Sequence, residues 1–323
     1  MDLSEEIILD RMLGCLYGQA IGDALGLGTE FMRKSEVSKY YPQGLSAYSQ
    51  IVGNDNSNLW KSGSWTDDTD MMLCILDGFE NGHFDINKIA LNFKEWFNGD
   101  PKGIGRHTYN LLYIGDYVKD PIYASKVVWE SSRCQSAANG GLMRTSVVGL
   151  PRNIRNKDIE DICRLTHYDP RCVGSCVVVS RLINNLIWEQ REMPLDELKD
   201  LGRMYDPMIE EWIELAYYGH LSYLRLDDRQ TMGYTLRTLA AGLWTYFHAV
   251  DFKNGLLSIV NEGGDADTNA AVACSVLGAK FGFSTIPESY VSGLYKVDVY
   301  DCKIRQFIDG LLIMKDDAGM ALF

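Results

Sequence analysis

Apolar residues recur at helical spacing along most of the chain. Residues 5–25 show this pattern first, with apolar side chains three or four positions apart. The same period predicts further helices over residues 68–80, 87–98, 121–134, 157–166, 171–189, 206–218, 229–249, 252–261, 267–282 and 302–314. Strand signals are few and short, and no Pro- or Ser-rich linker, repeat or low-complexity tract divides the chain. The pattern therefore predicts an all-α fold in which residues 1–323 form a single compact multi-helix domain.

Glycine recurs every four residues in the second half of the first predicted helix and just after it, at Gly14, Gly18, Gly22 and Gly26. Residues at this spacing share one side of a helix. Because glycine has no Cβ, such a row lets another backbone approach closely.

The longest segment predicted to be irregular covers residues 35–65. It is rich in Tyr, Ser, Asn and Gly, and it leads directly into a cluster of acidic residues. A long loop in this place is typical of a lid over a site.

Composition and charge exclude some classes of protein. The formal net charge is -13, whereas a binder of duplex nucleic acid needs a surplus of Lys and Arg to neutralise phosphates. A local basic pocket for one small anion remains compatible with this charge.

The eight cysteines include no CxxC pair and no dense disulfide framework, so we interpret them as reduced core thiols. The first residues lack the basic region and the following apolar stretch of a signal peptide. No apolar run approaches the roughly 18 residues of a membrane span. We therefore expect a cytoplasmic protein without a membrane partner, and a monomer by default.

The first acidic cluster is Thr66-Asp67-Asp68-Thr69, followed by Asp70 and then by an apolar run. Its oxygens therefore lie where a helix begins. Asp and Thr are favoured there as caps, but one cap needs one side chain rather than three acids. Helix capping and metal binding both remain open for this cluster alone.

The second acidic cluster repeats this arrangement, since Asp265-Ala266-Asp267-Thr268 follows two glycines and precedes a helix of small residues. Carboxylate and hydroxyl oxygens suit Mg²⁺, Mn²⁺ or Ca²⁺, whereas zinc would favour His or Cys, which neither cluster contains. Two such clusters predict a two-metal site. Metals about 3.5 to 4 Å apart can polarise a water molecule for hydrolysis.

Three separated motifs together resemble the ADP-ribosylglycohydrolase family: Gly18-Gln19-Ala20-Ile21-Gly22-Asp23-Ala24-Leu25-Gly26, Trp65-Thr66-Asp67-Asp68-Thr69, and Gly263-Gly264-Asp265-Ala266-Asp267-Thr268. The resemblance implies an all-α fold with a central dimetal site of two divalent cations, Mg²⁺ or Mn²⁺. It also implies six metal ligands: Thr66, Asp67, Asp68, Asp265, Asp267 and Thr268. The sequence departs from many members at Asn269, where they carry an apolar residue, and at Asp70.

The resemblance further implies residues that act on the substrate. Glu30 matches a mobile acidic residue that serves as general acid or base. The implied substrate-binding residues are Asn139, Gly140, Gly141, Met143, Arg144, His167, Gly233, Tyr234, Gly103 and Gly105. The loop at 139–144 would receive the diphosphate on its backbone amides, and the Tyr234 ring would stack on adenine. Taken alone, the loop would equally suit any turn, and His167 would equally suit a structural role.

The implied function is metal-dependent hydrolysis of a glycosidic bond to ADP-ribose, with an ADP-ribosylated protein, modified at arginine, as the partner. Three alternatives remain: another ADP-ribose linkage, such as serine, a nucleic-acid end or a small molecule; a non-catalytic ADP-ribose-binding or target-occluding member; and a phosphohydrolase that would release AMP. No part of the sequence fixes the linkage.

Overall fold

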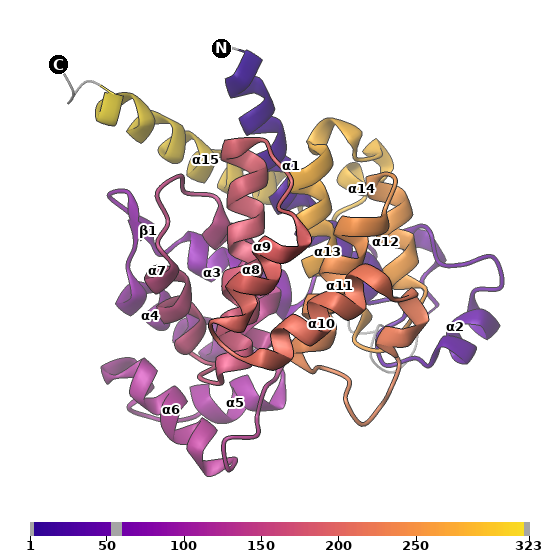
Figure 1. Cartoon of the computed structure of the whole chain (residues 1–323), viewed down its shortest axis with the longest axis horizontal. Helices are drawn as coiled ribbons and strands as arrows, with labels where there is room; N and C mark the ends of the chain where they lie inside the picture. The colour runs from indigo at the N-terminus through magenta and orange to yellow at the C-terminus, as the bar shows by residue number, and fades with distance from the viewer. Residues whose placement is uncertain (1–2, 53–59, 320–323) are drawn as a thin grey trace.

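The computed structural model describes residues 3–52 and 60–319, and almost all of its regular structure is helical (Figure 1). The helices are α1 (Leu3–Gly26), α2 (Lys34–Tyr40), α3 (Asp67–Leu76), α4 (Ile86–Asn98), α5 (Arg106–Leu112), α6 (Pro121–Ser131), α7 (Asn156–Arg164), α8 (Pro170–Asn184), α9 (Leu195–Arg203), α10 (Pro207–Tyr218), α11 (Thr235–His248), α12 (Phe252–Val260), α13 (Ala266–Phe281), α14 (Glu288–Ser292) and α15 (Val297–Gly319). Within the described ranges the strands are limited to a short antiparallel hairpin of β1 (Phe79–Glu80) and β2 (His83–Phe84). The all-α prediction is confirmed.

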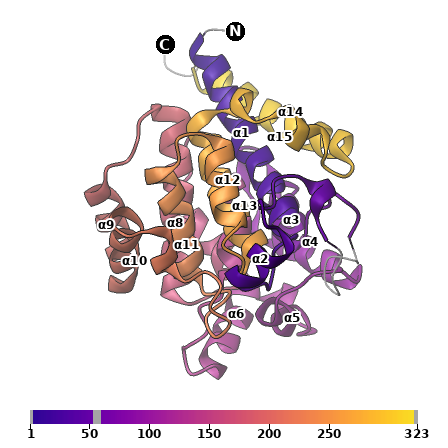
Figure 2. The same cartoon turned by 90° about the vertical axis from the view of Figure 1, so that its right-hand side faces the viewer.

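From Met12 onward, α1 is buried and lies antiparallel to α13 in the middle of the molecule, whereas its first turns project from the body (Figure 2). The four glycines of α1 face, in order, the backbones of Gly278, Cys274, Ala270 and Ala266. A Cβ at any of the four would overlap a backbone oxygen of α13. The predicted close approach of a second backbone is therefore observed, and it uses the small residues of both helices.

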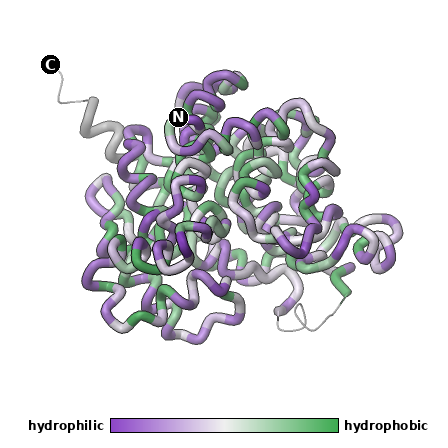
Figure 3. Tube along the Cα trace, turned by 60° about the horizontal axis from the view of Figure 1, so that its bottom comes forward, coloured by the Kyte–Doolittle hydropathy of each residue, from purple (hydrophilic) through white to green (hydrophobic). Residues whose placement is uncertain are grey.

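Other helices surround this central pair. α11 and α12 pack on α13, α10 packs on α11 and α9, and α7 packs on α8. One continuous set of buried apolar side chains extends from Ile8 in α1 to Leu311 in α15. Polar stretches of the chain gather at the periphery (Figure 3).

The structure corrects several predicted boundaries. α3 ends at Leu76, before the hairpin, and α11 begins at Thr235 rather than at 229. Gly233 has a φ of +80°, which a right-handed helix cannot contain. Segment 35–65 is not irregular throughout, because α2 and a 3₁₀ turn at Tyr48–Gln50 lie in it. Residues 53–59 of the expected lid lie outside the described residues.

The short helices α2, α5, α9 and α14 were not predicted. All eight cysteines are free thiols, but only five are buried, so the description as core thiols is wrong for Cys74, Cys134 and Cys302. Among the described residues, no helix has the length and apolar character needed to cross a membrane.

Candidate metal centre and substrate cleft

The two acidic clusters meet because three helix ends converge. The close packing of α1 on α13 brings Gly26, the last residue of α1, against Ala266 and Asp267 at the start of α13. α3 begins beside the same point, since Thr66 at its N-cap donates its backbone N–H to Asp23 of α1, at 2.9 Å. The glycine row thus determines where the acids lie.

Asp23 links α1 to the first acidic cluster. Its buried carboxylate accepts hydrogen bonds from the backbone N–H and hydroxyl of Thr69, at 3.1 and 2.7 Å. The hydroxyl of Thr66 lies 2.9 Å from Asp23 Oδ1 and 3.0 Å from Asp68 Oδ2, within donating distance of both. Asp23 therefore fixes the first turn of α3 and the side chain of Thr66.

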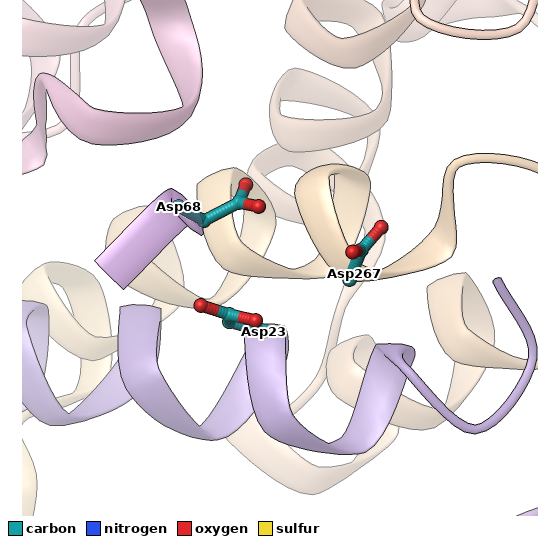
Figure 4. A group of neighbouring side chains, drawn as sticks. All are labelled: Asp23, Asp68 and Asp267. Atoms are coloured by element: carbon teal, nitrogen blue, oxygen red, sulfur yellow. The ribbon is translucent and has the colours of Figure 1, made fainter. Parts of the chain in front are cut away.

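Five acidic residues form two groups that share Asp267. Carboxylate oxygens of Asp23, Asp68 and Asp267 lie within 4.8 Å of one another, and so do those of Glu30, Asp265 and Asp267. Figure 4 shows the first group, with side chains from α1, α3 and α13 turned toward a common space. Two oxygen groups that share one carboxylate offer places for two neighbouring cations, which is compatible with a two-metal site.

Burial raises the pKa of the four Asp residues of these groups and also that of Asp67, which belongs to neither group. It raises the pKa of Asp23 to about 7 and that of Asp67 to about 6. For Asp68 and Asp267 the pKa lies well above its usual value, because burial is reinforced by neighbouring carboxylates, with Glu30 among those acting on Asp267. Like charges held together in a poorly solvated space favour protons or cations.

The residues present fit divalent cations. Oδ1 of Asp68 is buried and has no hydrogen-bond partner in the described part of the chain. A buried acceptor of this kind is costly unless a ligand satisfies it. The surrounding donors are carboxylate and hydroxyl oxygens, which Mg²⁺ and Mn²⁺ prefer.

The candidate metal centre forms one wall of a cleft with a volume of about 1030 Å³. Most of the predicted site residues line it: the six expected metal ligands together with Glu30, Gly103, Gly105, Asn139, Gly140, Met143, His167 and Gly233. Residues distant in sequence are thus brought to one cavity. Their individual roles remain predictions.

Three predicted substrate-binding residues lie outside the cleft lining. Gly141 packs on Cys163 and His167, and Arg144 is buried in the core with its guanidinium 4.4 Å from the centre of the Phe93 ring. The ring of Tyr234 packs edge-on against Trp212.

Asn139 is held by hydrogen bonds within the protein. Its backbone N–H donates to the carbonyl of Gly233, at 2.9 Å. Its side-chain amide donates to Asp265 Oδ2 at 2.7 Å and to Thr238 Oγ1 at 2.9 Å. In this structure Asn139 therefore orients an acid of the candidate metal centre, and both its backbone and its side-chain N–H groups donate within the protein.

Sequence reasoning did not single out some residues of the site. Asp23 was quoted only as part of the first motif, although an acid among the glycines of a buried helix was an available signal. Trp60, Arg106 and His107 also line the cleft. Arg106 and His107 belong to the stretch 102–108, which the resemblance linked to the site with weaker specificity and from which only Gly103 and Gly105 were selected, whereas Trp60 offered no pattern.

The fold and the cleft together define a class: a helical protein whose ligand cavity ends on two groups of carboxylates suited to cations. The family model for ADP-ribosylglycohydrolase matches residues 4–319. The chain belongs to the ADP-ribosylglycohydrolase family and is accordingly a hydrolase of glycosidic bonds.

Similar proteins agree with this family over nearly the whole chain. The chain is 28% identical over 313 residues to ADP-ribosyl-[dinitrogen reductase] glycohydrolase of Rhodospirillum rubrum, covering 94% of this chain and 96% of that protein. It is 27% identical to the ADP-ribosylarginine hydrolase Tri1 of Serratia proteamaculans, covering 90% and 77%. A solved structure described as an ADP-ribosylglycohydrolase-related protein complex superposes with a TM-score of 0.74 at 25% identity, covering 94% and 98%.

Proposed function

We propose that the protein hydrolyses the N-glycosidic bond between ADP-ribose and an arginine side chain of a modified protein, releasing ADP-ribose, with two Mg²⁺ or Mn²⁺ ions as cofactors. The observation that carries this proposal is the pair of carboxylate groups sharing Asp267 at the wall of the cleft. Arginine is supported as the linkage by the relatives named as ADP-ribosylarginine hydrolases. Eight free thiols fit a reducing cytoplasm as the place of action.

Thr66, Asp67, Asp68, Asp265, Asp267 and Thr268 would hold the two cations. When bound, the cations supply Lewis acidity toward ribose hydroxyls and a water molecule. The chain's own contribution is rigid placement, since Asp23 and Asn139 hold Thr66 and Asp265 by hydrogen bonds.

Glu30 is the proposed proton carrier. It lines the cleft, and a carboxylate oxygen of Glu30 lies within 4.8 Å of carboxylate oxygens of Asp265 and Asp267. A carboxyl group in this place can transfer a proton between the water and the leaving guanidine as positive charge develops on the ribose.

Defined substrates test the proposal directly. Arginine-linked and serine-linked ADP-ribose are incubated with the protein in EDTA, Mg²⁺ or Mn²⁺, and the products are separated by chromatography. We expect ADP-ribose from the arginine conjugate, no product in EDTA, and recovery with one of the ions. Release of AMP instead would identify cleavage of the diphosphate and overturn the proposal.

Two variants separate the roles of the acids. The double variant Asp67→Ala, Asp265→Ala should lose turnover while keeping its helices, whereas Asp116→Ala, at an exposed surface acid, should behave as wild type. Glu30→Gln should still bind ADP-ribose, but its kcat should fall by about 10². A wild-type rate for Glu30→Gln would remove Glu30 from the mechanism.

A second candidate function is the same hydrolysis at another linkage, such as serine. The chain is 23% identical to the ADP-ribosylhydrolase ARH3 of Danio rerio, covering 94% of this chain and 91% of that protein, and the name of this relative specifies no arginine linkage. Faster release from the serine conjugate in the same assay would favour this candidate over arginine.

A further inference from the structure

Arg144 is a fully buried cation without an acidic partner in the described structure. Its guanidinium stacks on Phe93, and one of its amino groups donates to the hydroxyl of Thr166, at 2.6 Å. Its remaining polar contact is a weak one, 3.7 Å to the sulfur of Met71. A buried charge of this kind is costly, so its contact with Thr166 is the place to look for a role.

The hydroxyl of Thr166 also contacts His167, with 2.7 Å between Oγ1 and Nδ1. Arg144 can only donate, so Thr166 Oγ1 accepts from it. The buried hydroxyl then satisfies its own hydrogen by donating to Nδ1. With Nδ1 as acceptor, a neutral His167 carries its proton on Nε2.

Nε2 of His167 is buried and has no partner within the described residues, yet the side chain lines the cleft. The space beside it exists because residue 140 is glycine. A Cβ at Gly140 would lie 2.9 Å from Cε1 and 3.2 Å from Nε2 of His167, and 3.3 Å from Oγ1 of Thr108. The glycine therefore leaves the edge of the His167 ring and the hydroxyl of Thr108 uncrowded at the wall of the cleft.

The neighbouring imidazole keeps this arrangement rigid. The rings of His107 and His167 have centroids 4.5 Å apart. His107 donates from Nε2 to the carbonyl of Thr166, at 2.9 Å, so its Nδ1 accepts from the hydroxyl of Ser136, also at 2.9 Å. Burial lowers the pKa of both histidines, reinforced at His167 by His107 and at both rings by the charge of Arg144, so both rings favour the neutral form.

We propose that Arg144 and Thr166 are positioning residues: they set His167, which the family resemblance already implies at the substrate, as a neutral Nε2–H donor toward an acceptor oxygen of the ADP-ribose moiety. The identity of the ligand rests on the proposed function, whereas the direction of the hydrogen bonds does not. Arg144 lies outside the cleft and would thus act on the ligand through the side chains of Thr166 and His167.

The hydrogen bonds can be tested without any ligand or turnover. Protein labelled with ¹⁵N at its five histidines is studied by two-bond ¹H–¹⁵N correlation, and His167 is assigned from the signals lost in His167→Asn. We expect wild type and Thr166→Ser to show a proton on Nε2 and an Nδ1 shift typical of a hydrogen-bonded acceptor. Thr166→Val, which removes the hydroxyl at nearly constant volume, should lose that acceptor shift.

Binding then tests the donor. Titration with ADP-ribose should move the Nε2–H signal of the wild type, and Thr166→Val should bind ADP-ribose about tenfold more weakly than Thr166→Ser, the effect of losing about one net hydrogen bond. Arg144→Gln is analysed in the same way if it folds. The comparison of Thr166→Val with Thr166→Ser decides whether the donor role holds without that variant.

Each outcome has one meaning. A proton on Nδ1 in the wild type would overturn the proposed direction of the hydrogen bonds. An unmoved Nε2–H signal on saturation with ADP-ribose, or equal affinities of the Val and Ser variants, would overturn the donor role. If the wild type binds no ADP-ribose, the proposed function fails, while the ¹⁵N spectrum still decides whether Arg144 and Thr166 set the ring.

Discussion

The side-chain amide of Asn139 donates a hydrogen bond of 2.7 Å to Oδ2 of Asp265. Its second N–H is directed to Thr238, whose hydroxyl donates to Asn269 Oδ1 at 2.8 Å. A buried hydrogen-bond network therefore connects α11 and α13 to Asp265, an acid of the candidate metal centre. Asn269, directly after the second acidic cluster, is the last member of this network.

Replacing Asn139 by Leu should weaken Mn²⁺ binding by about 10- to 100-fold, because an unsupported carboxylate loses its orientation. Calorimetric titration of Mn²⁺ measures the change. Asn110→Leu is the control, since Asn110 is an exposed residue of the same cleft. Equal affinities of the two variants would show that Asp265 needs no support from Asn139.

The sequence predicted the central helix pair and both acidic clusters because their signals are local. The four glycines of α1 and the small residues of α13 each form a row that can be read without the fold. The role of Asp23 could not be read in this way. Its hydrogen bonds join residues more than forty positions apart, which only the packing of α1 against α3 creates.

The missed and shifted helices have physical reasons too. α5 has seven residues and α14 has five, which is too few for a periodic pattern to stand out. α9 is largely polar and buries only Leu198 and Gly202. Arg144 illustrates the converse case, since a charged residue in a loop motif was expected at the ligand and instead lies in the core.

The stability of the metal-free protein should fall as the pH rises from about 5 to 8. Folded Asp23 and Asp67 have pKa values raised to about 7 and about 6, whereas an unfolded chain releases these protons near a pH of about 3.9. The folded state therefore binds more protons across this window, and the stability they contribute is lost as the pH passes their folded pKa values.

Thermal unfolding in EDTA at pH 5 and pH 8 measures this dependence. Mn²⁺ should raise Tm more at pH 8 than at pH 5, because protons no longer compete for the carboxylates. Asp67→Asn removes one titrating group and should flatten the pH dependence. A metal-free protein that is more stable at pH 8 would contradict the raised pKa values.

Packing of α1 on α13 predicts a large cost for a single methyl group. Gly22→Ala would place Cβ against the backbone of Ala270 and should lower the free energy of unfolding by about 1 to 3 kcal/mol or more. Gly310→Ala is the matched control, since a Cβ there has no neighbour within 4 Å in helix α15. That control should be neutral or stabilising by up to about 1 kcal/mol. Urea unfolding of both variants measures these changes. Equal losses of unfolding free energy in the two variants would refute the packing argument.

Replacement of Asp23 by Asn should destabilise the protein, even though the two side chains have nearly the same shape. Its two oxygens accept from the backbone N–H groups of Thr66 and Thr69 and from the Thr69 hydroxyl. An Asn side chain would turn an NH₂ group toward at least one of these buried donors. An unsatisfied buried donor costs about 1 to 3 kcal/mol, and the start of α3, which carries Asp67 and Asp68, would shift.

We therefore expect Asp23→Asn to lower Tm and to abolish detectable Mn²⁺ binding in the same titration. Asp85→Asn provides the comparison: Asp85 caps α4 by accepting from two backbone N–H groups, and Asn caps a helix about as well as Asp. Its Tm and Mn²⁺ affinity should stay close to those of the wild type. Loss of Mn²⁺ binding alone would not separate the hydrogen bonds of Asp23 from its carboxylate in the acidic group, so Tm in EDTA decides the point. A fall in Tm confined to Asp23→Asn assigns a stabilising role to the hydrogen bonds between α1 and α3, whereas similar Tm values of the two variants would reduce Asp23 to an ordinary cap.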